Sequence, residues 1–187
     1  MNKTSSTESK ILTTAGRLFA EGGYFGTSMN NIANEVGIGK SALYYYFESK
    51  EGLCKKLMRR DLSVLEKDLK RAVKKGVTPF DGLFQIILVL LSFRIEHPEI
   101  VLLTSFTGGI DEKKPIVRYI VEMRVSVLKL IREIIEEMDI TRRRSRKFIY
   151  VFSASLLGFL FSPFVPKEMD SKELAKQLTK YSLTTSK

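Results

Sequence analysis

The chain has 187 residues, 44% hydrophobic and 28% charged, and its 31 Lys and Arg against 21 Asp and Glu give a formal net charge of +10. This length and apolar fraction suffice for one or two packed domains, and 12 Phe with 7 Tyr argue against intrinsic disorder. The single cysteine, Cys54, and the single histidine, His97, exclude a disulfide framework, a cysteine zinc cluster and most catalytic-triad or metal chemistry.

Helical periodicity dominates the first half of the chain. The apolar face of the first helix consists of Ile11, Ala15, Leu18, Phe19 and Gly22. The glycine pair 22–23 is expected to end this helix, because glycine readily adopts a positive φ. Short helices with glycines between them are predicted over residues 28–36 and 40–47, and a long helix capped by Ser49 follows to about residue 75.

The second half of the chain is also helical in pattern and is more apolar. Further helices are predicted over residues 80–96, 98–107, 115–138, 142–162 and 171–181. Because no stretch alternates polar and apolar residues between turn signals, the predicted fold class is all-α. A boundary near Glu48 gives an N-terminal three-helix domain over residues 1–48 and a larger helical bundle over residues 49–187, joined by the long helix as a rigid connector.

Export and membrane insertion are not predicted. Residues 1–10 lack the apolar core of a signal peptide. The uncharged stretch 148–166 contains Pro163 and Pro166, which leave about 15 helical residues, roughly 22 Å, against a hydrocarbon core of roughly 30 Å. The chain is therefore expected to be cytoplasmic, and its positive charge favours nucleic acid over an acidic membrane surface as partner.

Residues 27–47 have the pattern of a helix-turn-helix unit, two short helices joined by a tight turn that contains glycine. Thr27 or Ser28 is placed to cap the first helix. Leu43 and Phe47 lie four residues apart and are expected to face inward on the second helix. The outward face then carries a cation, hydroxyls and rings without a carboxylate, which suits phosphate oxygens and base edges in a major groove. Its residues are Lys40, Ser41, Tyr44 and Tyr45, with Tyr46 at one edge.

Two other interpretations of this segment are weaker. The tyrosines at 44–46 are alternatively packing aromatics, but three successive helical positions cannot all point inward. Residues 37–41 end like a phosphate-binding loop, but Asn34 stands where the first glycine of such a loop belongs, and a helix rather than a strand precedes it. A DNA contact is therefore preferred to nucleotide binding.

The stretch from Ile11 to Leu53 contains the pattern A-x-x-L-F-x-x-x-G-Y-x-x-T-S-x-x-x-I-A-x-x-x-G-I-x-K-S-A-L-Y-Y-Y-F-x-S-K-E-x-L. This pattern resembles the DNA-binding domain of the TetR family of transcriptional regulators and covers about a quarter of the chain. The resemblance implies DNA contacts by Thr27, Ser28, Lys40, Ser41, Ala42, Tyr44, Tyr45, Tyr46 and Lys50. Within this set, Thr27 and Ser28 would touch the DNA backbone through hydroxyl and amide groups, and Tyr44 would meet a phosphate. The chain departs from the family at Gly39, where Ser or Thr commonly caps the third helix, and glycine is a weaker cap.

For residues 49–187 the resemblance implies a body that binds a small molecule and forms a homodimer. The expected ligand-pocket residues are Phe84, Leu88, Phe106, Tyr119, Met123 and Phe152. The expected dimer-interface residues, on the last two long helices, are Val151, Leu156, Phe159, Leu160, Leu174 and Leu178. The aromatic residues of the pocket set are alternatively plain core residues.

The resulting hypothesis is a ligand-responsive transcriptional regulator, expected to be a repressor, without enzymatic activity, catalytic residues, metal or cofactor. The homodimer is expected to bind a palindromic operator in double-stranded DNA, with recognition helices at least roughly 34 Å apart. A small apolar effector of unknown identity is expected to release it by favouring a dimer that no longer fits adjacent grooves. Two alternatives are a small helical enzyme that uses the body pocket, and a basic protein that binds DNA or membrane surfaces without sequence preference.

Three further features each allow two interpretations. The basic run over residues 142–147 is either a second nucleic-acid or lipid site or, preferably, a solvated loop and first helical turn. His97 is a helix-end residue in the simpler interpretation and a ligand contact in the other. Cys54 is a small packing residue unless a lowered pKa makes it a redox sensor.

Overall fold

The computed structural model describes residues 3–76, 78–105, 114–138, 146–161 and 170–184. Over these residues the chain is helical without strands, which confirms the predicted all-α fold class. The helices are α1 (Lys3–Gly26), α2 (Met29–Val36), α3 (Lys40–Tyr46), α4 (Lys50–Lys75), α5 (Pro79–Glu96), α6 (Pro98–Ser105), α7 (Pro115–Glu137), α8 (Arg146–Leu160) and α9 (Ser171–Thr184).

The first helix runs past its predicted end. It begins at Lys3, ahead of the apolar face that starts at Ile11, and it continues to Gly26 instead of ending at the glycine pair. Its helical geometry is nevertheless interrupted at Gly23, where φ is 70° and ψ is 166°. Glycine adopts this positive φ without the steric penalty of a Cβ atom. The pair therefore produces the predicted break, and helical residues resume after the kink.

Local backbone chemistry builds the turn between α2 and α3. Ser28 caps α2, because its Oγ accepts a hydrogen bond from the Asn31 N–H at 3.1 Å and its own N–H donates to Asn31 Oδ1 at 3.0 Å. Gly37 ends α2 in the left-handed region at φ 78°, and its N–H donates to the Ala33 carbonyl at 3.0 Å. Gly39 begins α3 without a side-chain cap. These stops and starts follow the sequence prediction and fix a tight turn.

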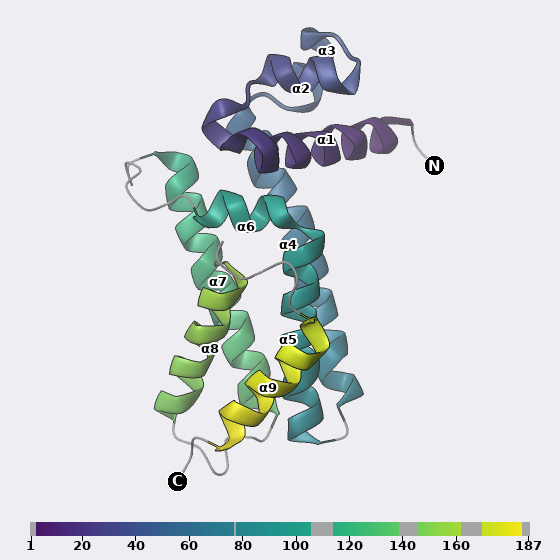
Figure 1. Cartoon of the computed structure of the whole chain (residues 1–187). Coiled ribbons are helices and arrows are strands. Elements are labelled where there is room, and N and C mark those ends of the chain that lie inside the picture. The colour runs from purple at the N-terminus through teal and green to yellow at the C-terminus, as the bar shows by residue number, and fades with distance from the viewer. Residues whose placement is uncertain (1–2, 77, 106–113, 139–145, 162–169, 185–187) are drawn as a thin grey trace.

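One apolar core runs from the helix-turn-helix unit into the body. In the N-terminal part it contains Phe19, Ile32 and Leu43, and α4 continues it through Leu57 and Leu69, all fully buried. Figure 1 shows α4 running from the α1–α3 region down into the body, beside α5. The buried face of α4 is therefore continuous from the N-terminal helices into the body.

The body is a helical bundle in which α5 packs against α4 and α9, and α8 packs against α7. Figure 1 shows α6 lying across this bundle, between it and α1, with which it is in contact. His97 ends α5, because the proline that follows it disfavours the helical conformation at this residue. α6 therefore links the body to α1. Among the described helices, none combines the length and the apolar character that a membrane crossing requires.

Candidate nucleic-acid interface

Two apolar side chains on its inner face hold α3 against α2. Leu43 is 0% exposed and Phe47 is 5% exposed. Both belong to the same buried cluster as Ile32, Ala33 and Val36 of α2. The predicted inward orientation of Leu43 and Phe47 is thereby confirmed. With this inner face fixed, the other side chains of α3 are free to face outward.

The outer face of α3 carries exposed aromatic and basic side chains and contains no acidic residue. The exposed residues at the start of the helix are Lys40, Ser41 and Ala42. Tyr45 is 81% exposed, Tyr44 is 41% exposed and Tyr46 is half-buried. Lys40 Nζ lies 5.9 Å from the centroid of the Tyr44 ring, a cation–π distance. The rings of Tyr45 and Tyr46 meet edge to face, with centroids 5.5 Å apart. This face therefore offers an ammonium group and phenol groups to a partner.

The structure corrects the expectation for the Thr27 hydroxyl. Thr27 is buried, and its Oγ1 lies 3.0 Å from the Leu18 carbonyl oxygen and 2.9 Å from that of Gly23. The hydroxyl therefore ties the end of α1 to the start of α2 and does not face outward. Ser28 is exposed, but its hydroxyl caps α2. A contact of these two residues with DNA through their amide groups stays a prediction.

Lys50, at the start of α4, is occupied by contacts within the protein. Its Nζ donates hydrogen bonds to the carbonyl oxygens of Tyr24 at 2.8 Å and Thr27 at 2.9 Å, and lies 4.4 Å from the Tyr24 ring centroid. Burial lowers the pKa of Lys50 below its usual value. This lysine positions the connection between α1 and α2, a role that spacing did not reveal because its partners lie 26 and 23 residues away. Its DNA contact stays a prediction.

Two more contacts, which the sequence does not predict, join α1 to α2. Lys10 Nζ donates to the carbonyl oxygen of Val36 at 3.0 Å, so a cation lies at the C-terminal end of α2, where the helix dipole favours it. Arg17 of α1 forms ion pairs with Glu35 of α2 and with Glu21 of its own helix. A basic residue on α1 gives no local signal for such a partner. These contacts link α1 to α2.

The cavities lined by described residues do not bring the expected pocket residues together. Leu88 lies in a groove between α4 and α5, whereas Tyr119 and Met123 lie in another between α4 and α7. Phe84 and Phe152 are half-buried and packed against the core, which fits the alternative of plain core residues. Phe106 lies outside the described residues.

A different cavity, of about 360 Å³, lies between the end of α1, α6 and α7. Its lining is mainly apolar and includes Phe19, Phe25, Leu103, Ile116, Val117 and Ile120. It therefore adjoins both α1 of the N-terminal region and two helices of the body.

Part of the expected dimer interface is buried inside the subunit. Leu156 and Leu160 are almost fully buried in the single chain, because α8 packs against α7 and α5. This corrects their assignment: they build the core and have no area left for a second subunit. Leu174 and Leu178 of α9 are half-buried. The side chains of Val151, of Phe159 and of the basic run over 142–147 lie outside what the structure describes.

The single cysteine packs in the core, and the single histidine lies at the end of a helix. Cys54 is fully buried, and burial raises the pKa of its thiol to about 12, so it is a protonated packing residue rather than a redox sensor. His97 ends α5, and its ring stacks on that of Phe93 with centroids 4.5 Å apart. The interpretation of His97 as a helix-end residue is thus confirmed.

Comparison with known proteins agrees with this arrangement. Residues 11–57, which include every predicted DNA contact, match the family model described as bacterial regulatory proteins, tetR family. Residues 11–57 form a DNA-binding domain of the TetR family. Members of this family are DNA-binding transcriptional regulators and not enzymes.

Curated relatives match part of this chain. IcaR of Staphylococcus aureus strain Newman, a negative transcriptional regulator of the biofilm operon icaADBC, is 33% identical over 88 residues, 47% of this chain and 47% of IcaR. An HTH-type transcriptional regulator in the lacX 3' region of Lactococcus lactis is 37% identical over 68 residues, 36% of this chain and 35% of the relative. The chain thus aligns with less than half the length of these relatives.

Solved structures of bacterial regulators share the fold over almost the whole chain. The fatty acid degradation regulator FadR from Bacillus halodurans has a TM-score of 0.79 at 16% identity, covering 97% of this chain and 96% of FadR. The TetR-family regulator PfmR from Thermus thermophilus has a TM-score of 0.71 at 23% identity, covering 92% of this chain and 96% of PfmR. At these identities the likeness establishes the fold of the body and nothing about its ligand.

Proposed function

We propose that this chain is a transcriptional repressor that binds an operator in double-stranded DNA through α3. The proposal is based on the outer face of α3. Tyr44 and Tyr45 are exposed there, Lys40 lies beside Tyr44, and the helix contains no acidic residue. Such rings contribute little to the core, whereas phenol and ammonium groups complement phosphate oxygens and base edges in a major groove. The description of IcaR as a negative regulator supports repression.

Each residue of the interface has a proposed role. Lys40 and Tyr44 bind phosphate oxygens, and Tyr45, the most exposed ring, reaches base edges. The face is completed by Ser41, Ala42 and Tyr46. Thr27 and Ser28 approach the DNA backbone through the amide groups at the start of α2, where the helix dipole favours an anion. Lys50 contributes chiefly by positioning this segment.

The proposed organisation is a DNA-binding unit over residues 1–48 and a body over residues 49–187 that binds an effector and forms a homodimer. Two subunits would place their α3 helices in successive major grooves of a palindromic operator, with half-site centres at least roughly 34 Å apart. In this arrangement α9 supplies interface area through Leu174 and Leu178, which the single chain leaves half-buried.

The proposed effector is a small apolar molecule. The cavity between α1, α6 and α7 has a mainly apolar lining, and its volume of about 360 Å³ falls within the range of roughly 300–1,000 Å³ typical of ligand sites. A molecule there contacts both α1 and the body, so its affinity depends on their relative position, as release from an operator requires. The related fold of AibR, solved with isovaleryl coenzyme A and operator DNA, supports a regulator that combines both ligands.

Replacing Tyr44 with alanine is expected to weaken operator binding by about 1–2 kcal/mol, because a phosphate contact and a partly packed ring are lost. The measurement is a fluorescence-anisotropy titration with an operator selected from random DNA. Val125→Ala, at an exposed position on α7, is the matched control and should bind like the unaltered chain. An unchanged affinity for folded Tyr44→Ala would contradict the assignment of this face.

Operator affinity is also expected to fall steeply as salt rises, because the bound phosphates release their counterions. Lys40→Gln in both subunits of a dimer should reduce the slope of log affinity against log salt by about 2, one unit for each phosphate contact. Titrations at a series of salt concentrations measure both slopes. Equal slopes for the two proteins would remove Lys40 from the phosphate contacts.

A further inference from the structure

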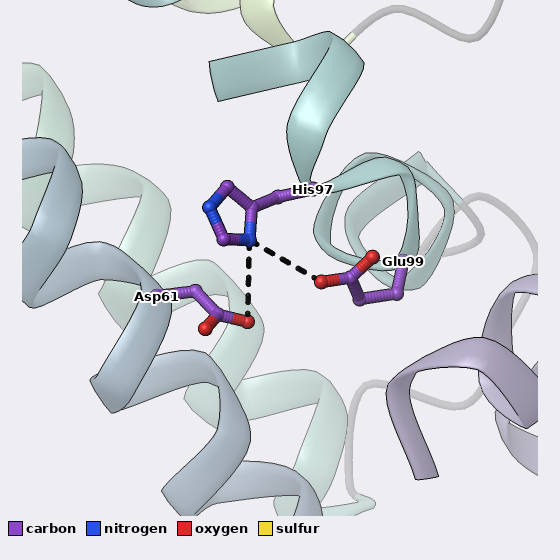
Figure 2. Close-up of side chains that lie close together, drawn as sticks. All are labelled: Asp61, His97 and Glu99. Atoms are coloured by element: carbon purple, nitrogen blue, oxygen red, sulfur yellow. Dashed lines mark hydrogen bonds and ion pairs between the residues drawn. The ribbon is translucent and has the colours of Figure 1, made fainter. Parts of the chain in front are cut away.

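Three ionisable side chains meet at the junction of α4, α5 and α6, away from the outer face of α3 (Figure 2). Asp61 comes from α4, His97 from the end of α5, and Glu99 from the first turn of α6. His97 Nδ1 lies 3.4 Å from Glu99 Oε1 and 3.7 Å from Asp61 Oδ2. Figure 2 shows both carboxylates turned toward this nitrogen. Three possible ligand atoms therefore converge on one point.

The protein encloses this cluster. The side chain of Asp61 is 1% exposed, that of Glu99 12% and that of His97 18%. Asp61 Oδ1 accepts a hydrogen bond from Arg60 Nε at 2.7 Å. Asp61 Oδ2 is buried and accepts no hydrogen bond from the part of the chain that the structure describes. A buried carboxylate oxygen without a partner is destabilising, so a cation beside Oδ2 would satisfy it.

The distances from His97 Nδ1 to the two carboxylate oxygens are longer than those of strong hydrogen bonds. They fit better the distances between atoms that bind the same ion. A charge-assisted bond between nitrogen and a carboxylate oxygen spans about 2.7–2.9 Å, which is shorter than the 3.4 Å and 3.7 Å of His97 here. Nitrogen and oxygen ligands bind Zn²⁺ at about 2.0–2.2 Å, so two ligands of a tetrahedral ion lie roughly 3.3–3.6 Å apart. The three ligand atoms all lie within 4.8 Å of one another, so they gather around a space of the size that one ion occupies.

Charge and ring packing also favour a cation at this point. Asp61 and Glu99 bring two carboxylates beside a single imidazole in this enclosed place. Stacking on Phe93 holds the His97 ring in its orientation toward the carboxylates. One imidazole and two carboxylates form a donor set that suits divalent transition metals such as Zn²⁺.

We propose that Asp61, His97 and Glu99 bind a divalent transition-metal ion through His97 Nδ1 and one oxygen of each carboxylate, with solvent completing the coordination. The proposal goes beyond operator binding and does not depend on it. The sequence predicts no metal site, because one histidine without a ligand-spacing motif gives no signal. The donor set forms only when α4 packs beside the α5–α6 junction.

The position of this site connects it to the N-terminal region. Gly16 of α1 lies beside Glu99, since a Cβ atom at Gly16 would be 3.3 Å from Glu99 Cγ. An ion held by Asp61 and Glu99 therefore joins α4 to α6 at the place where α6 meets α1. Because the unfolded chain does not assemble these ligands, metal binding stabilises the folded chain.

The test is a Zn²⁺ titration of the full chain, free of any affinity tag and dialysed against a chelator. Calorimetry is expected to give one ion per chain. His97 is the only histidine, so the nitrogen NMR signals of a histidine-labelled sample report on this site alone. The Nδ1 signal is expected to shift until one equivalent of Zn²⁺ has been added.

Variants of the three ligands locate the bound ion. His97→Gln, Glu99→Gln and Asp61→Asn are each expected to weaken Zn²⁺ binding by at least about tenfold. Glu96→Gln, at the exposed residue preceding His97, is the matched control and should bind Zn²⁺ like the unaltered chain. Thermal unfolding by circular dichroism shows which variants fold, and Zn²⁺ should raise the midpoint of the control but not those of the ligand variants. If Asp61→Asn does not fold, the test relies on the other two ligand variants.

Two results would overturn the proposal. One is a histidine signal that does not respond when Zn²⁺ is added in excess. The other is unchanged Zn²⁺ affinity in folded His97→Gln and Glu99→Gln. Neither measurement contains DNA, so failure of the metal site is distinguishable from failure of the proposed operator binding.

Discussion

Replacing Leu43 with alanine is expected to lower the free energy of unfolding by about 2–5 kcal/mol, because it leaves a cavity beneath α3. Leu43 is fully buried and, together with Phe47, forms the apolar contact of α3 with α2. Since α3 has only seven residues and no side-chain cap, it depends on this packing more than a long helix would. Operator binding should fall together with stability. Chemical denaturation and an operator titration measure the two effects.

Tyr45→Ala is the matched control for this prediction. It removes a larger side chain from the same helix, but the ring is 81% exposed, so the free energy of unfolding should change by no more than about 0.5 kcal/mol. The difference between the stability losses of the two variants distinguishes the buried inner face of α3 from its exposed outer face. Equal losses of stability in Leu43→Ala and Tyr45→Ala would mean that the faces of α3 are assigned incorrectly.

Replacing Lys50 with methionine is expected to lower the free energy of unfolding by about 1–3 kcal/mol, because the carbonyl oxygens of Tyr24 and Thr27 lose a charged donor. The connection between α1 and α2 would then be less firmly held on α4. We expect operator affinity to decrease through this loss of order, with the salt dependence of binding largely retained. Denaturation and titrations at several salt concentrations test both points.

Lys67→Met, at an exposed position of the same helix, is the control for the loss of a lysine and should change stability by no more than about 0.5 kcal/mol. The alternative role of Lys50 is a direct phosphate contact. That role predicts unchanged stability for Lys50→Met together with a smaller salt slope, a combination that would contradict the positioning role.

Local signals account for most of what the sequence predicted correctly. Gly37 and Gly39 mark the turn, Ser28 supplies a cap, and the spacing of Leu43 and Phe47 defines the inner face of α3. Each of these signals acts over one or two helical turns, so a linear pattern contains it in full.

Contacts between distant segments account for what the sequence did not show. The partners of Lys50 lie 23 and 26 residues away, and Asp61 meets His97 only after α4 packs beside α5. An apolar stripe likewise does not reveal which neighbour covers it. The apolar pattern of α8 therefore predicts a dimer interface at Leu156 and Leu160, although both pack inside their own subunit.

Selection of bound fragments from random double-stranded DNA tests the central proposal most directly. We expect the unaltered chain to enrich one inverted repeat and to bind it far more tightly than random DNA of equal length. A triple variant of the outer face of α3, Lys40→Ala with Tyr44→Ala and Tyr45→Ala, should remain folded and lose this preference. Equal retention of all fragments by the unaltered chain, or an undiminished preference in the folded triple variant, would contradict operator recognition by α3.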